Sequence, residues 1–164
     1  PRDIEWHFIG HLQTNKVKYI VPYVALIHGI DSYKLLAEVD KQAAKAGRRV
    51  NCLLQLHIAR EETKFGFSFN ECRQMLAEGQ WRQLQYIHLC GLMGMATNTD
   101  NVEQIKEEFR SLSDFFREVK STWFADDAAF CELSMGMSHD YHEAIAEGST
   151  LVRVGSKIFG ERIY

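Results

Sequence analysis

The chain has 164 residues, a length that suits one domain with a substantial core and is short for two. Hydrophobic residues make up 46% and charged residues 25%, which is the composition of a globular protein rather than a disordered or fibrous one. The 19 basic and 22 acidic residues leave a formal net charge of -3. No overall positive field therefore draws the chain to nucleic acid or to an anionic membrane.

The longest strongly apolar stretch, residues 19–30, contains Pro22 and His28 and falls short of the roughly 20 residues that cross a bilayer. We therefore expect no association with a membrane. The four cysteines are far apart in the sequence and form no paired motif: Cys52, Cys72, Cys90 and Cys131. We expect free thiols in a reducing cytoplasm, three of them in buried strands.

In chain order, short apolar runs alternate with longer amphipathic stretches, which is typical of repeated β-α units around a parallel sheet. The expected strands, all suited to burial on both faces, are residues 6–10, 24–28, 50–56, 86–92, 129–134 and 151–155. The expected helices are residues 32–46 and 101–120, with shorter ones at 15–23, 70–78 and 141–147. Ser32 and Gly47 suit the beginning and the end of the first long helix.

Six such units in 164 residues match the density of a (β/α)8 barrel, which uses about 250 residues for eight. An open doubly wound sheet is the alternative, but residues 10–13 (Gly-His-Leu-Gln) lack the usual G-x-G-x-x-G turn. We therefore predict an α/β fold of the TIM-barrel type, with residues 1–164 as a single domain that lacks the first two β/α units. The chain starts at Pro1, as a truncated piece would, and we expect its exposed sheet edges to cause self-association or lower stability.

Two successive strands end in small turns that carry hydroxyl groups, at residues 136–138 (Gly-Met-Ser) and 155–156 (Gly-Ser). In a barrel these turns lie side by side at the end where ligands bind. Glycine lets backbone N–H groups approach a ligand closely, hydroxyl groups add donors, and a helix N-terminus favours an anion. The turns predict a phosphate site at Ser138, Gly155 and Ser156, although such residues also serve simply to turn a chain.

Arg153 is a charged residue in the middle of a short apolar strand, between Val152 and Val154. Such a side chain points into a barrel or onto a helix layer, and a buried charge needs a partner. We expect that partner to be a carboxylate, or the ring nitrogen or anionic group of a ligand.

Other chemistry has little support, because the chain has no G-x-S-x-G elbow, P-loop, H-E-x-x-H or C-x-x-C motif. The pairs His7 with His11 and His139 with His142 have ligand-like spacing, but no carboxylate or thiol completes a metal set. Three histidines near strand ends are interpreted as hydrogen-bonded packing residues: His28, His57 and His88. We expect neither a catalytic residue nor a metal site.

The segments around these residues resemble one known family. Its C-terminal segments are matched by residues 133–140 (LSMGMSHD), 144–150 (AIAEGST) and 152–160 (VRVGSKIFG). Its earlier segments are matched, in the same order, by residues 6–16 (WHFIGHLQTNK), 62–66 (ETKFG) and 91–93 (GLM). On these segments the chain is identified as a member of the YggS/PROSC family of pyridoxal 5'-phosphate (PLP) homeostasis proteins, whose barrel is similar to the N-terminal domain of alanine racemase.

The resemblance implies an intracellular, monomeric parent protein that binds, buffers or delivers PLP without catalysis. It places Ser138 and the Gly155–Ser156 turn at the phosphate and Arg153 at the pyridine nitrogen, where an unprotonated nitrogen weakens the ring as an electron sink. A PLP-dependent amino-acid racemase is the alternative, but racemases of this fold need a second base from another domain.

The resemblance also locates what this chain does not match. The family's lysine that bonds the PLP aldehyde lies on the first strand of the longer chain, and no segment here corresponds to it. Lys64 and Lys157 are the lysines whose positions could bring them near a ligand, with no sign in the sequence of special reactivity.

Overall fold

The computed structural model describes residues 3–62, 65–161 and 163. Within these residues, the strands form one parallel sheet in the order β1 to β6: β1 (Trp6–Phe8), β2 (Val24–Ile30), β3 (Val50–Leu56), β4 (Ile87–Gly94), β5 (Glu132–Met137) and β6 (Leu151–Arg153). The α-helices are α1 (Val17–Ile20), α2 (Tyr33–Ala46), α3 (Phe69–Glu78), α4 (Val102–Trp123), α5 (Tyr141–Ala146) and α6 (Ser156–Phe159). Two 3-10 helices complete the set, η1 (Thr14–Lys16) and η2 (Gln80–Gln83).

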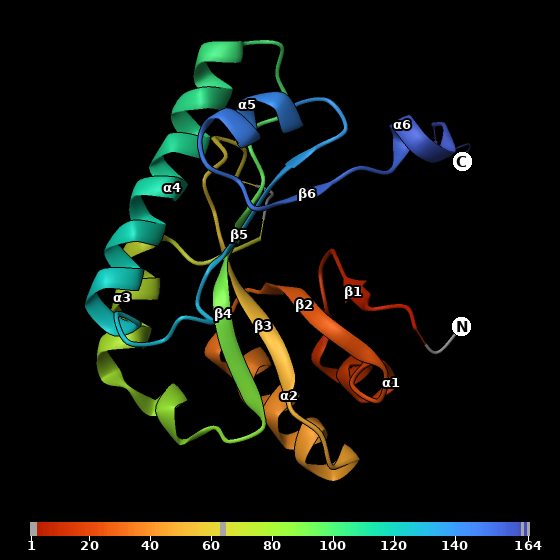
Figure 1. Ribbon diagram of the computed structural model, residues 1–164, viewed down its shortest axis with the longest axis vertical. Helices are drawn as coiled ribbons and strands as arrows, with labels where there is room; N and C mark the ends of the chain where they lie inside the picture. Colours follow the sequence, from red (N-terminus) through yellow and green to blue (C-terminus); the bar gives the residue numbers. More distant parts are fainter. Residues whose placement is uncertain (1–2, 63–64, 162, 164) are drawn as a thin grey trace.

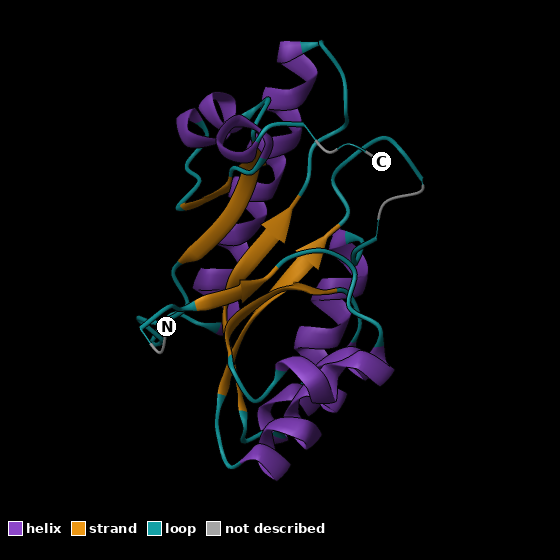
Figure 2. Ribbon diagram, turned by 90° about the vertical axis from the view of Figure 1, so that its right-hand side faces the viewer, coloured by secondary structure: helices purple, strands orange, loops and turns teal. Residues whose placement is uncertain are grey.

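The sheet is curved, and α2, α3 and α4 follow its convex face (Figure 1). Figure 2, turned by 90°, shows the strands crossing the molecule beside this layer of helices. The strands β1 and β6 are the two edges of the sheet, and both lie on the same side of the molecule in Figure 1. Strand order, parallel pairing and curvature together give a TIM-barrel-type fold that stays open between β1 and β6, and the predicted fold class is confirmed.

The long helices begin and end where the sequence indicates. The Ser32 side chain accepts a hydrogen bond from the backbone N–H of Leu35 at 3.1 Å, and Gly47 ends α2 in the left-handed conformation, with φ at 66°. Ser68 and Glu71 form a reciprocal capping box at the start of α3. These caps satisfy backbone groups that a helix end leaves without partners, and so they fix where each helix meets the sheet.

The differences from the predicted elements lie at the edges and in the turns. β1 and β6 have only three residues each. β1 has two exposed residues and one half-buried one, and β6 has one exposed, one half-buried and one buried residue, so the expectation of burial on both faces is wrong for these two edge strands. β5 begins three residues later than predicted, because the backbone N–H of Phe130 bonds to the carbonyl of Asp127 in a preceding turn. The helix expected at residues 15–23 is divided into η1 and the single turn α1.

The cysteines are free thiols, as predicted. Cys52 and Cys90 are buried in strands, whereas Cys72 is buried on α3. Cys131 lies just before β5 and is exposed, so the prediction that it is buried in a strand is wrong. Burial raises the pKa of the Cys72 and Cys90 thiols to about 12, which keeps both protonated at neutral pH.

Two apolar clusters lie on opposite faces of the sheet. The large one fills the space between the sheet and the helices and includes Leu36, Phe109, Leu112 and Phe130, all fully buried. The small one consists of buried residues Leu26, Leu53, Cys90 and Met93. Among the described residues, no helix combines the length and the apolar character that crossing a membrane requires.

Candidate functional site

The four residues predicted to form a site lie together. Ser138, Arg153, Gly155 and Ser156 line one pocket of about 590 Å³, beyond the carboxyl ends of β5 and β6. Residues 137, 139 and 159–161 complete its wall. This is the end of a parallel barrel at which ligands bind, so the fold brings the predicted residues to a suitable place.

Ser138 connects the two turns of the pocket. Its hydroxyl oxygen accepts a hydrogen bond from the backbone N–H of Gly155 at 3.1 Å. Ser156 then begins α6, where the first N–H groups of a helix have no acceptor within the helix. A Cβ atom added at Gly155 would meet no atom within 4 Å, so the backbone is open to a ligand there. The turn therefore offers a hydroxyl group and backbone donors beside open space.

Gly136 has a different role from the one that the turn pattern suggests. Its φ is +101°, and an added Cβ would lie 2.6 Å from the Cβ of Ala144 on α5. Glycine is required at this position so that α5 can pack closely on β5. Gly136 therefore belongs to the helix packing and not to the pocket.

The Arg153 side chain is buried, with 7% of its surface exposed. Nη1 donates to the Ser134 hydroxyl oxygen at 2.6 Å and Nη2 donates to the carbonyl oxygen of Gly94 at 3.0 Å. Nε has no hydrogen-bond partner within residues 3–62, 65–161 and 163. Burial lowers the pKa of Arg153 to about 10, opposed by the charge of Asp140, so the guanidinium stays protonated at neutral pH. The groups that accept from it are uncharged, so among the described residues the guanidinium is a buried cation whose Nε–H has no acceptor.

Three residues that the sequence did not assign to the site extend the hydrogen bonds of Arg153 across the sheet. Ser134 Oγ lies 2.8 Å from Nδ1 of His28, and Nε2 of His28 lies 3.0 Å from Nδ1 of His7. His28 and Ser134 are almost fully buried, at 1% and 0% exposed. Each is a polar residue inside an apolar strand, the same signal that marks Arg153, and that signal could have revealed both.

Asp140 is a buried carboxylate, 2% exposed, that directly follows the pocket residues Ser138 and His139 in the sequence. Its Oδ1 accepts a hydrogen bond from the backbone N–H of Met137 at 2.7 Å, and Oδ2 lies 3.3 Å from Nε2 of His139. The carboxylate therefore holds the turn that carries Ser138. The sequence shows Asp140 just before α5, but it does not show that the side chain turns back to accept from the backbone N–H of Met137.

The other candidate ligands and lysines do not gather at this pocket. His11 pairs with Asp31 at 3.4 Å and stacks on Phe65, with ring centroids 3.9 Å apart, whereas His7 contacts His28. Nζ of Lys157 lies 4.7 Å from the ring centroid of Tyr141, and Lys157 does not line the pocket. Lys64 lies outside the described residues. In the part of the chain that the structure describes, no three His, Cys, Asp or Glu side chains form a metal-binding group.

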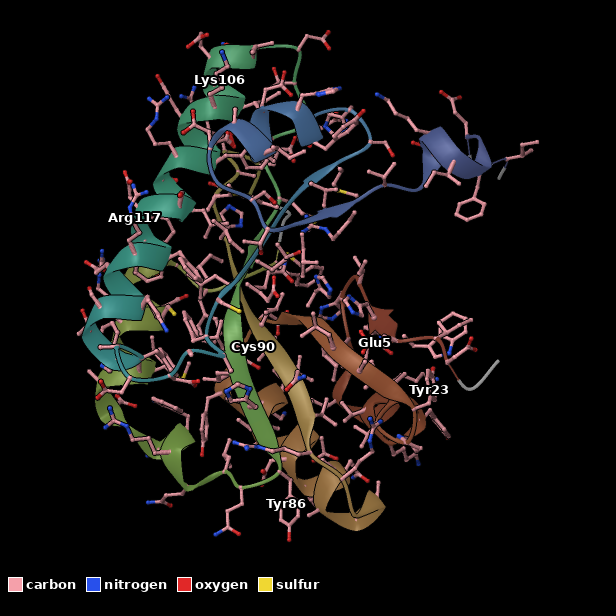
Figure 3. All side chains as sticks on the ribbon, in the orientation of Figure 1. Glu5, Tyr23, Tyr86, Cys90, Lys106 and Arg117 are labelled. Carbon is pink, nitrogen blue, oxygen red and sulfur yellow. The ribbon has the colours of Figure 1, made fainter. Side chains whose placement is uncertain are left out.

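Two further hollows lie near the opposite ends of the strands. One, of about 410 Å³, is lined by Glu5 and Cys90, both labelled in Figure 3, together with His7. The other, of about 300 Å³, lies beside His88, whose Nε2 is 3.0 Å from Oδ2 of Asp127. That neighbouring imidazole lowers the pKa of Asp127. Neither hollow contains any of the four predicted residues.

The sequence matches the family described as "Alanine racemase, N-terminal domain" over residues 3–163. A pyridoxal phosphate homeostasis protein of Aquifex aeolicus is 39% identical over 162 residues, covering 99% of this chain and 69% of that relative. A protein of the same name from Pasteurella multocida is 35% identical and covers 98% of this chain and 67% of the relative.

Solved structures agree with the sequence matches. PipY of Synechococcus elongatus, solved without PLP, superposes with a TM-score of 0.88 at 34% identity, covering 96% of this chain and 72% of PipY. PipY with PLP bound superposes with a TM-score of 0.84 at 33% identity. An alanine racemase of Clostridium difficile, 16% identical with a TM-score of 0.70, shares the fold. This chain therefore belongs to the alanine racemase N-terminal domain family and, within it, to the pyridoxal phosphate homeostasis proteins.

Proposed function

We propose that this chain binds PLP in the pocket beyond β5 and β6 and serves PLP homeostasis as a carrier or buffer. The observation that carries the proposal is the pocket of about 590 Å³ in which Ser138, Arg153, Gly155 and Ser156 lie together. In it, Arg153 Nε is buried and has no hydrogen-bond partner in the part of the chain that the structure describes. A buried cation with a free donor fits a ligand that brings an acceptor atom. The related PipY, solved with PLP bound, supports PLP as that ligand.

Each residue has a distinct task in this proposal. The Ser138 hydroxyl and the backbone N–H groups at the start of α6 would hold the phosphate, because they are donors beside open space. Arg153 would face the pyridine nitrogen, and its charge disfavours a proton on that atom. PLP supplies a reactive aldehyde and an electron-accepting ring when it is bound. An arginine at the nitrogen weakens the ring as an electron sink, which suits storage better than catalysis.

The finer features of the proposal follow from the same residues. We infer a non-catalytic role, because relatives above 30% identity are named as homeostasis proteins, whereas the solved racemase supports the shared fold alone. We infer that residues 1–164 act as one cofactor-binding domain, since the site is built from the last strands of a single sheet. Four free thiols fit a reducing cytoplasm.

Equilibrium dialysis and absorbance would test PLP binding to this chain. We expect reversible binding, with no lysine adduct in the intact mass after borohydride treatment. Arg153→Ala and Ser138→Ala should each weaken binding about tenfold or more, because each removes a donor to a charged or polar ligand atom. Arg117→Ala is the matched control, since Arg117 lies on α4 and points away from the sheet (Figure 3). Unchanged binding by both site variants would contradict the proposed site.

A further inference from the structure

A chain of hydrogen bonds crosses the sheet from one edge to the other. It begins at Arg153 on β6, passes through Ser134 on β5 and His28 on β2, and ends at His7 on β1. Three bonds of 2.6, 2.8 and 3.0 Å join the four side chains. Since β3 and β4 separate β2 from β5 within the sheet, the chain spans its concave face rather than following neighbouring strands.

The donors and acceptors fix the direction of each hydrogen bond in this series. Arg153 can only donate, so Ser134 Oγ accepts from Nη1. Burial and the charge of Arg153 lower the pKa of His28 to about 3, so its ring is neutral at pH 7 and carries one N–H. With the Ser134 hydroxyl donating to Nδ1 of His28 and Nε2–H of His28 donating to Nδ1 of His7, each of the three hydrogen bonds has one donor and one acceptor.

The opposite tautomer of His28 fits less well. Nδ1–H would then donate to Ser134, whose single hydroxyl proton would find no acceptor among the hydrogen bonds of the described residues. A donor directed at the donors of Arg153 would also repel them. The tautomer with the proton on Nε2 therefore makes Ser134 a fixed acceptor for Arg153.

This fixed acceptor determines how Arg153 faces the pocket. Ser134 and the Gly94 carbonyl hold the two terminal nitrogens, Nη1 and Nη2, while Nε stays free. We propose that Ser134 and His28 are positioning residues. They hold the Arg153 guanidinium in one orientation, in which Nε–H can donate to the ring nitrogen of a bound ligand. This inference rests on the proposed function for its ligand, but the orientation itself exists without one.

Nuclear magnetic resonance of the unliganded protein tests the orientation directly. We expect 15N shifts that show a neutral His28 with its proton on Nε2, and separate signals for Arg153 Nη1 and Nη2. In Ser134→Ala the two Arg153 signals should merge, because the guanidinium can rotate. A proton on Nδ1 of His28, or merged signals in the unaltered chain, would overturn the proposal.

Binding of 4-deoxypyridoxine 5'-phosphate tests the consequence, since this probe has a pyridine nitrogen and a phosphate but no aldehyde. Ser134→Ala and His28→Leu should weaken its binding about tenfold and shift the absorbance of the bound ring. His28→Asn should restore binding to within about threefold, because its amide oxygen occupies the place of Nδ1 and can accept from Ser134.

The two measurements separate this inference from the proposed function. If the unaltered chain does not bind the probe, the proposed function fails, while the resonance signals still decide whether Ser134 and His28 orient Arg153. If the probe binds and Ser134→Ala binds it equally well with separate Arg153 signals, the positioning role is wrong and the cofactor site stands. A folded His28→Asn that binds as weakly as His28→Leu would also contradict the positioning role.

Discussion

The two faces of the sheet are built by different chemistry. The convex face packs against α2, α3 and α4 through a continuous apolar cluster that includes the aromatic residues Phe109 and Phe130. The concave face has a small apolar cluster around Leu53 and Met93, and beside it the buried polar chain from Arg153 to His28. The convex face therefore supplies most of the burial that stabilises the fold, while the concave face can carry polar groups that serve a ligand.

Substitution of one leucine on each face is the strongest way to test this difference. Leu112 of α4 and Leu53 of β3 are both fully buried. Leu112→Ala should lower the free energy of unfolding by about 4 kcal/mol, because the closely packed helix layer cannot collapse around the cavity. Leu53→Ala should cost nearer to about 2 kcal/mol, since the smaller cluster on the concave face can relax.

Urea unfolding followed by circular dichroism measures both values. The two variants are matched in chemistry and in burial, so the difference between them reports the packing around each site. Equal losses of stability would show that the concave face is packed as tightly as the convex one, and the comparison between the faces would fail.

The sequence predicts the convex face well, because the spacing of apolar residues and the capping residues both indicate its helices. Apolar residues at helical spacing identify α2 and α4, and Ser32 with Gly47 marks both ends of α2. The number of strands and their parallel arrangement follow from the alternation of short apolar runs with helices. The local pattern does not identify the edge strands. The apolar residues of β1 and β6 predict buried strands, yet each strand lies at an edge of the sheet with a neighbouring strand on one side.

The site is predicted in part. Small turns after two adjacent strands identify Ser138, Gly155 and Ser156, and a charge in an apolar strand identifies Arg153. The partners of Arg153 were not predicted, because Ser134 and Gly94 meet it only when three strands are aligned in register. The apolar pattern shows which residues of a strand face inward but not which residue of a distant strand lies opposite, so these particular contacts come from the structure.

The pH dependence of stability should expose the buried histidine of the concave face. The pKa of His28 is lowered from 6.5 to about 3 in the folded chain, so between these values the unfolded chain binds a proton that the folded chain does not. Stability therefore falls as the pH falls through this window. Between pH 7 and pH 5 this one group should cost about 2 kcal/mol.

His28→Asn isolates this contribution, because it removes the titrating ring and keeps an acceptor for Ser134. The difference in unfolding free energy between the unaltered chain and His28→Asn should change by about 2 kcal/mol from pH 7 to pH 5 and should level off below about pH 3. Other groups titrate equally in both chains and cancel. A difference that is independent of pH would show that His28 is protonated as readily in the folded chain as in the unfolded one.

The edge strands β1 and β6 border both faces of the sheet. Self-association through these strands is the smallest of the expected effects. Among the described residues, β6 pairs with β5 alone and β1 with β2 alone, so unpaired backbone groups are available to a second copy of the chain. We expect self-association that depends on concentration. Val152→Lys, at a position 38% exposed on β6, should weaken it about tenfold, because a lysine on an edge strand must lose water when another strand pairs there.

Val102→Lys, at a position 43% exposed on α4, is the control and should leave association unchanged. Sedimentation equilibrium of the three chains would decide: a monomer at all concentrations, or equal weakening by both lysines, would show that the open edges do not drive association.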